Sequence, residues 1–131
     1  MRAYAVIDIG GTAIKYGCAT EEGQFLEKAS RPTRTGAVSI PDAVLAIVKD
    51  MAARHELAGI AIDTAGIVRP GEDGEIVFAG ETTFPGYSGT KLGRIVRETM
   101  QLPVLVENDV NAAAISGLRS AAFTMASKPS A

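Results

Sequence analysis

The sequence predicts an α/β domain with one mixed five-stranded sheet flanked by helices. Residues 4–7 are uninterruptedly apolar, as in a strand buried on both faces, so a strand at 3–9 is expected at the centre of the sheet. Strand and helix patterns follow one another in the order β-β-β-α-β-β-α-β-α. The 131 residues, 47% hydrophobic and 21% charged, suit one globular domain with a sizeable core.

The first half of the chain has the patterns of three strands and one helix. After the helix N-cap expected at Ser39, Pro41 lies in the first turn, where a missing N–H costs nothing. Apolar residues then recur with helical spacing to about Arg54. The three strands are expected at residues 3–9, 13–19 and about 24–31.

The second half alternates between strands and helices. Leu92, Ile95, Val96 and Met100 share one face of an expected helix, with charged residues opposite. Asp63 and Thr64 are interpreted as loop-capping residues that follow a buried strand. The expected elements are strands at 58–62, 75–78 and 103–106, a helix at 89–101 and a helix that begins at Asn108.

A strand, two glycines and a second strand at the start of the chain have the layout of a phosphate-binding hairpin. Gly10 and Gly11 lack a Cβ, so backbone N–H groups there can approach phosphate oxygens. Thr12 can donate a hydrogen bond to phosphate, and Asp8 offers Mg²⁺ the oxygen ligand that it prefers. Lys15 is a nearby charge or a structural lysine. An ordinary hairpin with a Gly-Gly turn is the alternative interpretation.

A second polar group follows the apolar strand at 103–106. Glu107, Asn108, Asp109 and Asn111 are four polar residues within five positions. Open α/β folds place ligand-binding side chains at the carboxyl ends of buried strands. A helix N-cap would explain Asn108 or Asp109, but it would not explain all four residues.

These two motifs together resemble the ROK family of sugar kinases and related repressors, in the actin-like ATPase (ribonuclease H-like) superfamily. Two middle segments, 59–68 and 84–92, are similar to the family's glycine turn beside the sugar and to its next loop. The resemblance covers about residues 4–116. Thr83 stands where many members have a sugar-binding Asn, and Gly117 stands where the family usually has Glu.

The resemblance implies a role for each motif residue. ATP and Mg²⁺ are the implied cofactors, and a hexose or hexosamine is the implied substrate. The implied roles are catalytic base for Asp109, substrate binding for Gly66, Asn108 and Asp109, phosphate binding for Gly10, Gly11, Thr12 and Lys15, and metal binding for Asp8.

The resemblance divides the chain into an amino-terminal lobe at 1–117 and an atypical tail at 118–131, which we expect to be an extra helix or disordered. The family's second lobe, with a zinc cluster and the adenosine pocket, has no counterpart here. A truncated gene, a frameshift or a deliberately cloned domain would each explain this. The lobe alone is therefore expected to be inactive. The alternative is a non-catalytic sugar-sensing or assembly module, although the phosphate motif at residue 4 leaves no room for a preceding helix-turn-helix domain.

Composition argues against several other classes of function. A net charge of −2 without a basic stripe argues against nucleic-acid binding. The chain has neither a membrane-spanning run nor a signal peptide, so a cytoplasmic location is the default. One cysteine, Cys18, and one histidine, His55, make no usual zinc site; Cys18 is expected in the core and His55 on the surface.

Assembly is the last expectation. Without a second lobe, an apolar patch should remain near the tail, and a second copy of the chain would then cover it in a homo-oligomer. The alternative is that the tail folds back and covers the patch itself. The patch is expected to include Val110, Ile115, Leu118, Phe123 and Met125.

Overall fold

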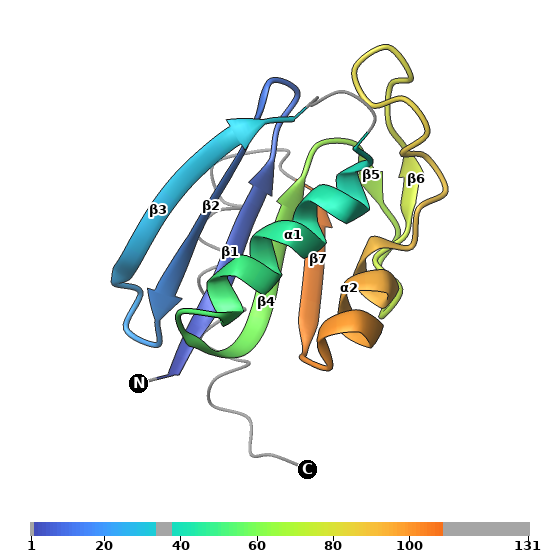
Figure 1. The fold of residues 1–131 in the computed structure, drawn as a ribbon. Helices are drawn as coiled ribbons and strands as arrows, with labels where there is room; N and C mark the ends of the chain where they lie inside the picture. The colour runs from blue at the N-terminus through green and yellow to red at the C-terminus, as the bar shows by residue number, and fades with distance from the viewer. Residues whose placement is uncertain (1, 34–37, 109–131) are drawn as a thin grey trace.

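The computed structural model describes residues 2–33 and 38–108. Seven strands and two helices lie within these ranges (Figure 1). In chain order they are β1 (Arg2–Ile9), β2 (Ala13–Thr20), β3 (Phe25–Pro32), α1 (Ile40–Ala52), β4 (Glu56–Thr64), β5 (Ile67–Val68), β6 (Ile76–Phe78), α2 (Leu92–Met100) and β7 (Val104–Asn108).

Five of the strands form one mixed sheet in the order β3-β2-β1-β4-β7, with β1 at its centre (Figure 1). Strand β1 is antiparallel to β2 and parallel to β4, and β4 is parallel to β7. The predicted mixed five-stranded sheet with a central first strand is therefore confirmed. Strands β5 and β6 form a separate two-stranded ribbon.

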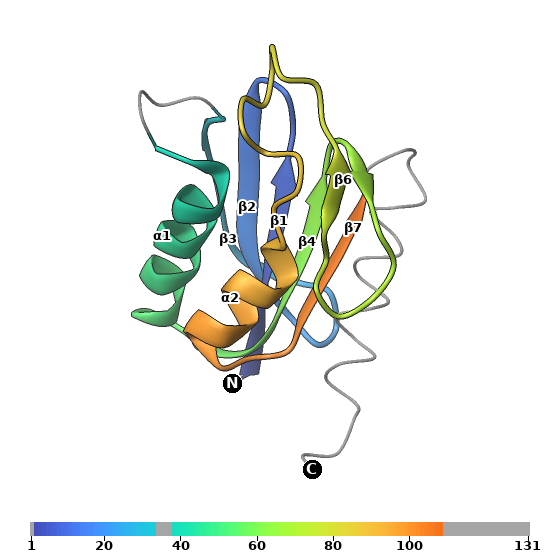
Figure 2. The same ribbon diagram turned by 90° about the vertical axis from the view of Figure 1, so that its right-hand side faces the viewer.

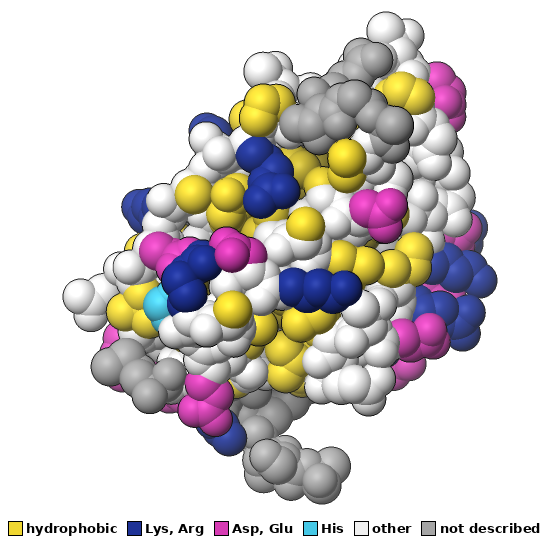
Figure 3. Space-filling view, in the orientation of Figure 1, with side chains coloured by type: hydrophobic (Ala, Val, Ile, Leu, Met, Phe, Trp, Pro, Cys, Tyr) yellow, Lys and Arg dark blue, Asp and Glu magenta, His cyan; other side chains and the backbone are white. Residues whose placement is uncertain are grey.

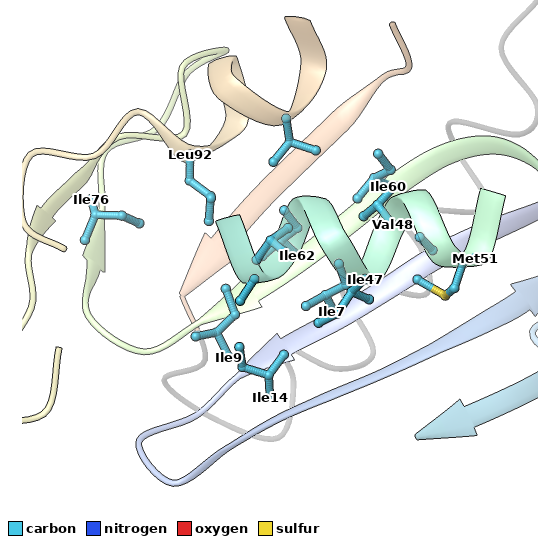
Figure 4. Close-up of a cluster of buried hydrophobic side chains, with 14 of the residues drawn as sticks. Ile7, Ile9, Ile14, Ile47, Val48, Met51, Ile60, Ile62, Ile76 and Leu92 are labelled. Carbon is cyan, nitrogen blue, oxygen red and sulfur yellow. The ribbon is translucent and has the colours of Figure 1, made fainter. Parts of the chain in front are cut away.

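Both described helices lie on one face of the main sheet (Figure 2). Their apolar sides meet alternate residues of β1 and β4, which is the period that a strand imposes on its two faces. Figure 4 shows this core in close-up. Its fully buried members include Ile7, Ile9, Ile14, Val44, Ile47, Val48, Met51, Ile60, Ile62, Ile76, Leu92 and Val96. Cys18 is also wholly buried there, and burial raises the pKa of its thiol to about 11.

The helix ends follow local sequence signals. Ser39 caps α1 as predicted, because its Oγ accepts a hydrogen bond from the Asp42 amide. Helix α2 ends at Met100, and its C-cap is Gln101, whose φ of 57° is left-handed and whose N–H donates to the carbonyl of Arg97. Helix α2 is shorter than predicted because residues 89 and 90 hydrogen-bond to Ile76 at the edge of β6 instead.

Three further expectations need correction. Strand β5 was not predicted, so the observed order has one more strand than expected. Strand β4 extends through Asp63 and Thr64, so these two residues are buried in a strand rather than in a capping loop. Asn108 is the last residue of β7 rather than the start of a helix. The helix expected after it and the tail lie outside the described residues.

His55 is less exposed than predicted. Its Nε2 lies 2.7 Å from Glu27 Oε2, and Arg54 donates to the other oxygen of the same carboxylate at 2.7 Å. Figure 3 shows the histidine among acidic and basic side chains. These hydrogen bonds, first from Arg54 and then from His55, lower the pKa of Glu27 to about 2. The contact ties the end of α1 to the edge strand β3. Neither described helix is long and apolar enough to cross a membrane.

Candidate functional site

The carboxyl ends of three parallel strands meet at one edge of the sheet. Ile9 of β1, Thr64 of β4 and Asn108 of β7 are in register across this edge. The chain turns just beyond the first two of them, at Gly10–Thr12 and at Ala65–Gly66, and the amide of Ala65 donates to the carbonyl of Ile9 at 2.9 Å. The topology thus brings together segments that are about 50 and 100 residues apart in the sequence.

The β1–β2 turn is held by backbone contacts. The Gly10 amide donates to the Ala13 carbonyl at 3.0 Å, and the Thr33 hydroxyl donates to the Gly10 carbonyl at 2.6 Å. Gly11 and Thr12 are exposed at the tip. A Cβ placed on Gly11 would lie 3.3 Å from the Thr83 methyl group, so the loop at 79–90 packs against this turn. The exposed tip is therefore the part that an anion can approach.

Two buried aromatic residues anchor the loop at 79–90. The rings of Phe84 and Tyr87 lie 5.7 Å apart, and Tyr87 shares a buried 2.8 Å hydrogen bond with the Thr64 hydroxyl. The Thr64 hydroxyl donates its proton to the Ala65 carbonyl, so the Tyr87 hydroxyl is the donor between the two side chains. Burial raises the pKa of Tyr87, which keeps this donor protonated. The loop and the end of β4 are therefore fixed to each other.

Gly66 begins the turn into β5 with a φ of +98°. A Cβ at this position would lie 2.7 Å from the Phe78 carbonyl oxygen. Both the backbone conformation and the close approach of β6 require glycine here. Gly66 thus lies at the same edge as the Gly10–Thr12 turn, and its close approach to Phe78 gives it a structural role.

Polar residues form a row across the face of the sheet opposite the helices. The strand register places Ser30, Lys15, Asp8, Asp63 and Glu107 side by side, one from each strand of the main sheet. Asp8 and Lys15 were candidate site residues from the sequence, whereas Asp63 was interpreted there as a loop-capping residue and not as their neighbour. The sequence does contain a signal for this position. Asp63 lies one residue before the end of β4, as Asp8 lies one residue before the end of β1.

A hollow of about 520 Å³ opens on this face beside the polar row. Asp8, Lys15 and Asp63 line one part of it, and Phe25 and Lys28 line another. The Lys28 ammonium lies 4.5 Å from the centre of the Phe25 ring. The hollow therefore combines carboxylates, ammonium groups and an aromatic wall.

Of the expected site residues, those in the two glycine turns, Gly10–Thr12 and Gly66, lie at one edge of the sheet. Asn108 is in register with Ile9 and Thr64, which belong to the helix-covered face, whereas Asp8 and Lys15 belong to the open face. Asp109 lies outside the described residues, so its implied role as the catalytic base stays a prediction. Within those residues no three or more His, Cys, Asp or Glu side chains form a metal cluster. Mg²⁺ at phosphate-transfer sites takes only one or two carboxylates, and Asp8 fits that mode.

Known proteins with similar sequences and structures identify the family of this chain. The sequence pattern of the ROK family matches residues 4–124. An uncharacterized protein of Clostridium perfringens is 45% identical over 117 residues, which are 88% of this chain and 39% of that protein. A glucokinase of Streptomyces coelicolor is 36% identical over 108 residues, or 82% of this chain and 33% of the enzyme.

A solved ROK family glucokinase from Streptomyces griseus, in complex with glucose and AMPPNP, superimposes with a TM-score of 0.73. It is 33% identical, and the match covers 89% of this chain and 36% of that one. The chain therefore spans only about a third to two fifths of the length of the relatives that it matches.

Proposed function

Because this chain belongs to the ROK family, we propose that it is the amino-terminal lobe of an ATP-dependent hexose kinase. Its five-stranded mixed sheet with two helices matches the lobe structures of ROK and actin-like ATPase proteins. The substrate would be glucose or a related hexose or hexosamine, and the phosphoryl donor would be ATP. The relatives are longer than this chain, and in this proposal their additional residues correspond to a second lobe that completes the cleft.

The phosphate half of the proposed site is the β1–β2 turn. Gly11 and Thr12 are exposed at the tip, where amide groups and a hydroxyl suit phosphate oxygens. Lys15 is exposed on the open face and adds a positive charge nearby. Asp8 would hold Mg²⁺ directly or through water. When bound, Mg²⁺ neutralises charge on the phosphate oxygens.

The sugar half of the proposed site comprises Gly66 and Asn108 at this edge, together with Asp109, which follows Asn108 in the sequence. The Asn108 amide would donate to one sugar hydroxyl and accept from another. Asp109 would be the general base. It takes the proton of the sugar 6-hydroxyl while the hydroxyl oxygen bonds to the γ-phosphorus of ATP and the bond to ADP breaks. A sugar hydroxyl is too weak an acid to ionise first, so a positioned carboxylate is needed.

One observation carries the proposal. The turn with two glycines, the turn at Gly66 and the end of β7 are far apart in the sequence, yet they converge on one edge of the sheet. Phosphoryl transfer depends mainly on positioning, so convergence of a phosphate-binding turn with polar strand ends is what the reaction requires.

The proposal predicts that the 131 residues alone do not phosphorylate sugars, whereas a chimera does. An open cleft leaves water around the phosphates, which weakens each electrostatic contact. The chimera joins residues 1–117 to the remaining two thirds of the Streptomyces coelicolor glucokinase. A coupled assay with ATP and glucose or N-acetylmannosamine measures both proteins. Robust turnover by the lone chain would contradict the need for a second lobe, and a folded chimera without turnover would contradict the kinase assignment.

A further inference from the structure

Each of the two glycine turns at the carboxyl edge of the sheet has a backbone amide that makes no hydrogen bond within the described ranges of the chain. These are the amides of Gly11, in the β1–β2 turn, and of Gly66, in the turn after β4. The proposed function assigns phosphate to the first turn and sugar to the second. A backbone amide binds a ligand only when its N–H points out of the turn, so the orientation of these two peptide groups matters.

A buried threonine hydroxyl holds the carbonyl group that precedes each of these amides. The Thr33 hydroxyl donates to the Gly10 carbonyl at 2.6 Å, and the Thr64 hydroxyl donates to the Ala65 carbonyl at 3.0 Å. Thr33 is 4% exposed and Thr64 is wholly buried. The peptide bonds at both places are trans, and in a trans peptide the N–H points opposite to the C=O. Each glycine amide therefore points away from its threonine hydroxyl.

The glycines make this control necessary. A peptide group flips when ψ of one residue and φ of the next change together, and glycine accepts either sign of φ. Gly66 already has a φ of +98°. In the Gly10–Gly11 peptide neither residue has a Cβ that would favour one orientation. A hydroxyl bound to the preceding carbonyl supplies the preference that the backbone lacks.

Both threonines are held by contacts outside the two turns. The Thr33 amide donates to the Thr12 carbonyl at 3.0 Å, which extends the β2–β3 pairing by one residue. Thr64 is the last residue of β4, and its hydroxyl accepts the 2.8 Å hydrogen bond of Tyr87. Because the Thr64 oxygen accepts from Tyr87, its own proton is directed to the Ala65 carbonyl. The two hydroxyls are therefore in place before a ligand arrives.

We propose that Thr33 and Thr64 are positioning residues, which hold the Gly11 amide toward a phosphate oxygen and the Gly66 amide toward a sugar hydroxyl. Each threonine acts through one carbonyl group and does not itself contact the ligand. A donor that is already aimed costs no reorganisation when the ligand binds. This inference rests on the proposed function, which supplies the ligands of the two turns.

Thr33→Val and Thr64→Val test the inference in the full 131-residue chain, by NMR titration with Mg²⁺·AMPPNP and with glucose. Valine keeps the shape of threonine and removes the hydroxyl. Thr33→Val should raise the Kd of the nucleotide about five- to tenfold, which is what one hydrogen bond contributes. It should leave the Kd of glucose within about twofold, because separate sites act independently. Thr64→Val should show the opposite selectivity, so each variant is the matched control of the other.

Two further measurements separate positioning from a general loss of stability. Thr33→Ser and Thr64→Ser keep the hydroxyl and should bind both probes as the parent chain does. Without any ligand, the carbonyl ¹³C resonance of Gly10 should move upfield in Thr33→Val, and that of Ala65 should move upfield in Thr64→Val, since each carbonyl loses a hydrogen bond. If valine unfolds either chain, alanine replaces it, with the same expected selectivity.

The inference and the proposed function fail in different ways. Valine variants that bind both probes as tightly as the parent would overturn the inference, and so would an equal loss for both probes in each variant. Unchanged carbonyl resonances in the valine variants would overturn it without reference to any ligand. A parent chain that binds neither probe would instead contradict the proposed function and, with it, the ligands assigned to the two amides.

Discussion

Asp109→Asn in the chimeric enzyme is expected to lower kcat/KM for glucose about 10³-fold, within the range of general-base contributions. The carboxamide keeps the size of the side chain and can still hydrogen-bond the sugar, but it cannot take the proton of the attacking hydroxyl. The loss should therefore lie mainly in kcat, with a small change in KM. Steady-state kinetics in the coupled assay measures both.

Asp42→Asn is the matched control for this substitution. Asp42 is an exposed carboxylate in the first turn of α1. The same chemical change there should leave kcat within about twofold of the parent chimera, because surface substitutions far from the site have small effects. An Asp109→Asn chimera with nearly full activity would contradict the assignment of Asp109 as the base.

Gly66→Ala is expected to destabilise the chain by about 2–4 kcal/mol. Part of this cost is the positive φ of +98°, which an alanine adopts with strain. The rest is the clash of the new Cβ with the Phe78 carbonyl oxygen, only 2.7 Å away on β6. The β5–β6 ribbon would have to move away from the end of β4. Urea denaturation followed by circular dichroism measures the free energy of unfolding.

Gly71→Ala separates the two contributions. Gly71 also has a positive φ, of +136°, but a Cβ there meets no heavy atom within 4 Å. Its substitution should cost only the backbone strain, about 1 kcal/mol. Equal losses for Gly66→Ala and Gly71→Ala would show that the contact between Gly66 and Phe78 does not constrain the turn.

Strand β1 and helix α1 were predictable because the sequence signals that specify them are local. The apolar run of β1, the Ser39 cap and the spacing of apolar residues in α1 each act within a few residues. The β5–β6 ribbon was not predictable in full. Strand β5 is two residues long, and its pairing depends on Gly66, whose role appears only when β6 lies against it.

The candidate site was predictable as a set of motifs but not as a geometry. Parallel strands bring their carboxyl ends to one edge, so the meeting of Gly10 with Gly66 could be inferred from the sequence. The burial of Asp63 and Thr64 could not be inferred from the sequence. Their environment comes from pairing with β1 and β7 and from the Tyr87 hydroxyl, which is 23 residues away in the chain.

The most direct test of the central claim is an NMR titration of the uniformly ¹⁵N-labelled chain with glucose and with Mg²⁺·AMPPNP. If this lobe carries half of a sugar-kinase site, each ligand should bind weakly, with a Kd of about 1–10 mM, since half of the contacts are absent. Glucose should shift the amides of Ala65, Gly66 and Asn108, and the nucleotide should shift those of Gly11 and Thr12. Shifts confined to the β3 edge, or none at saturating ligand, would contradict the claim.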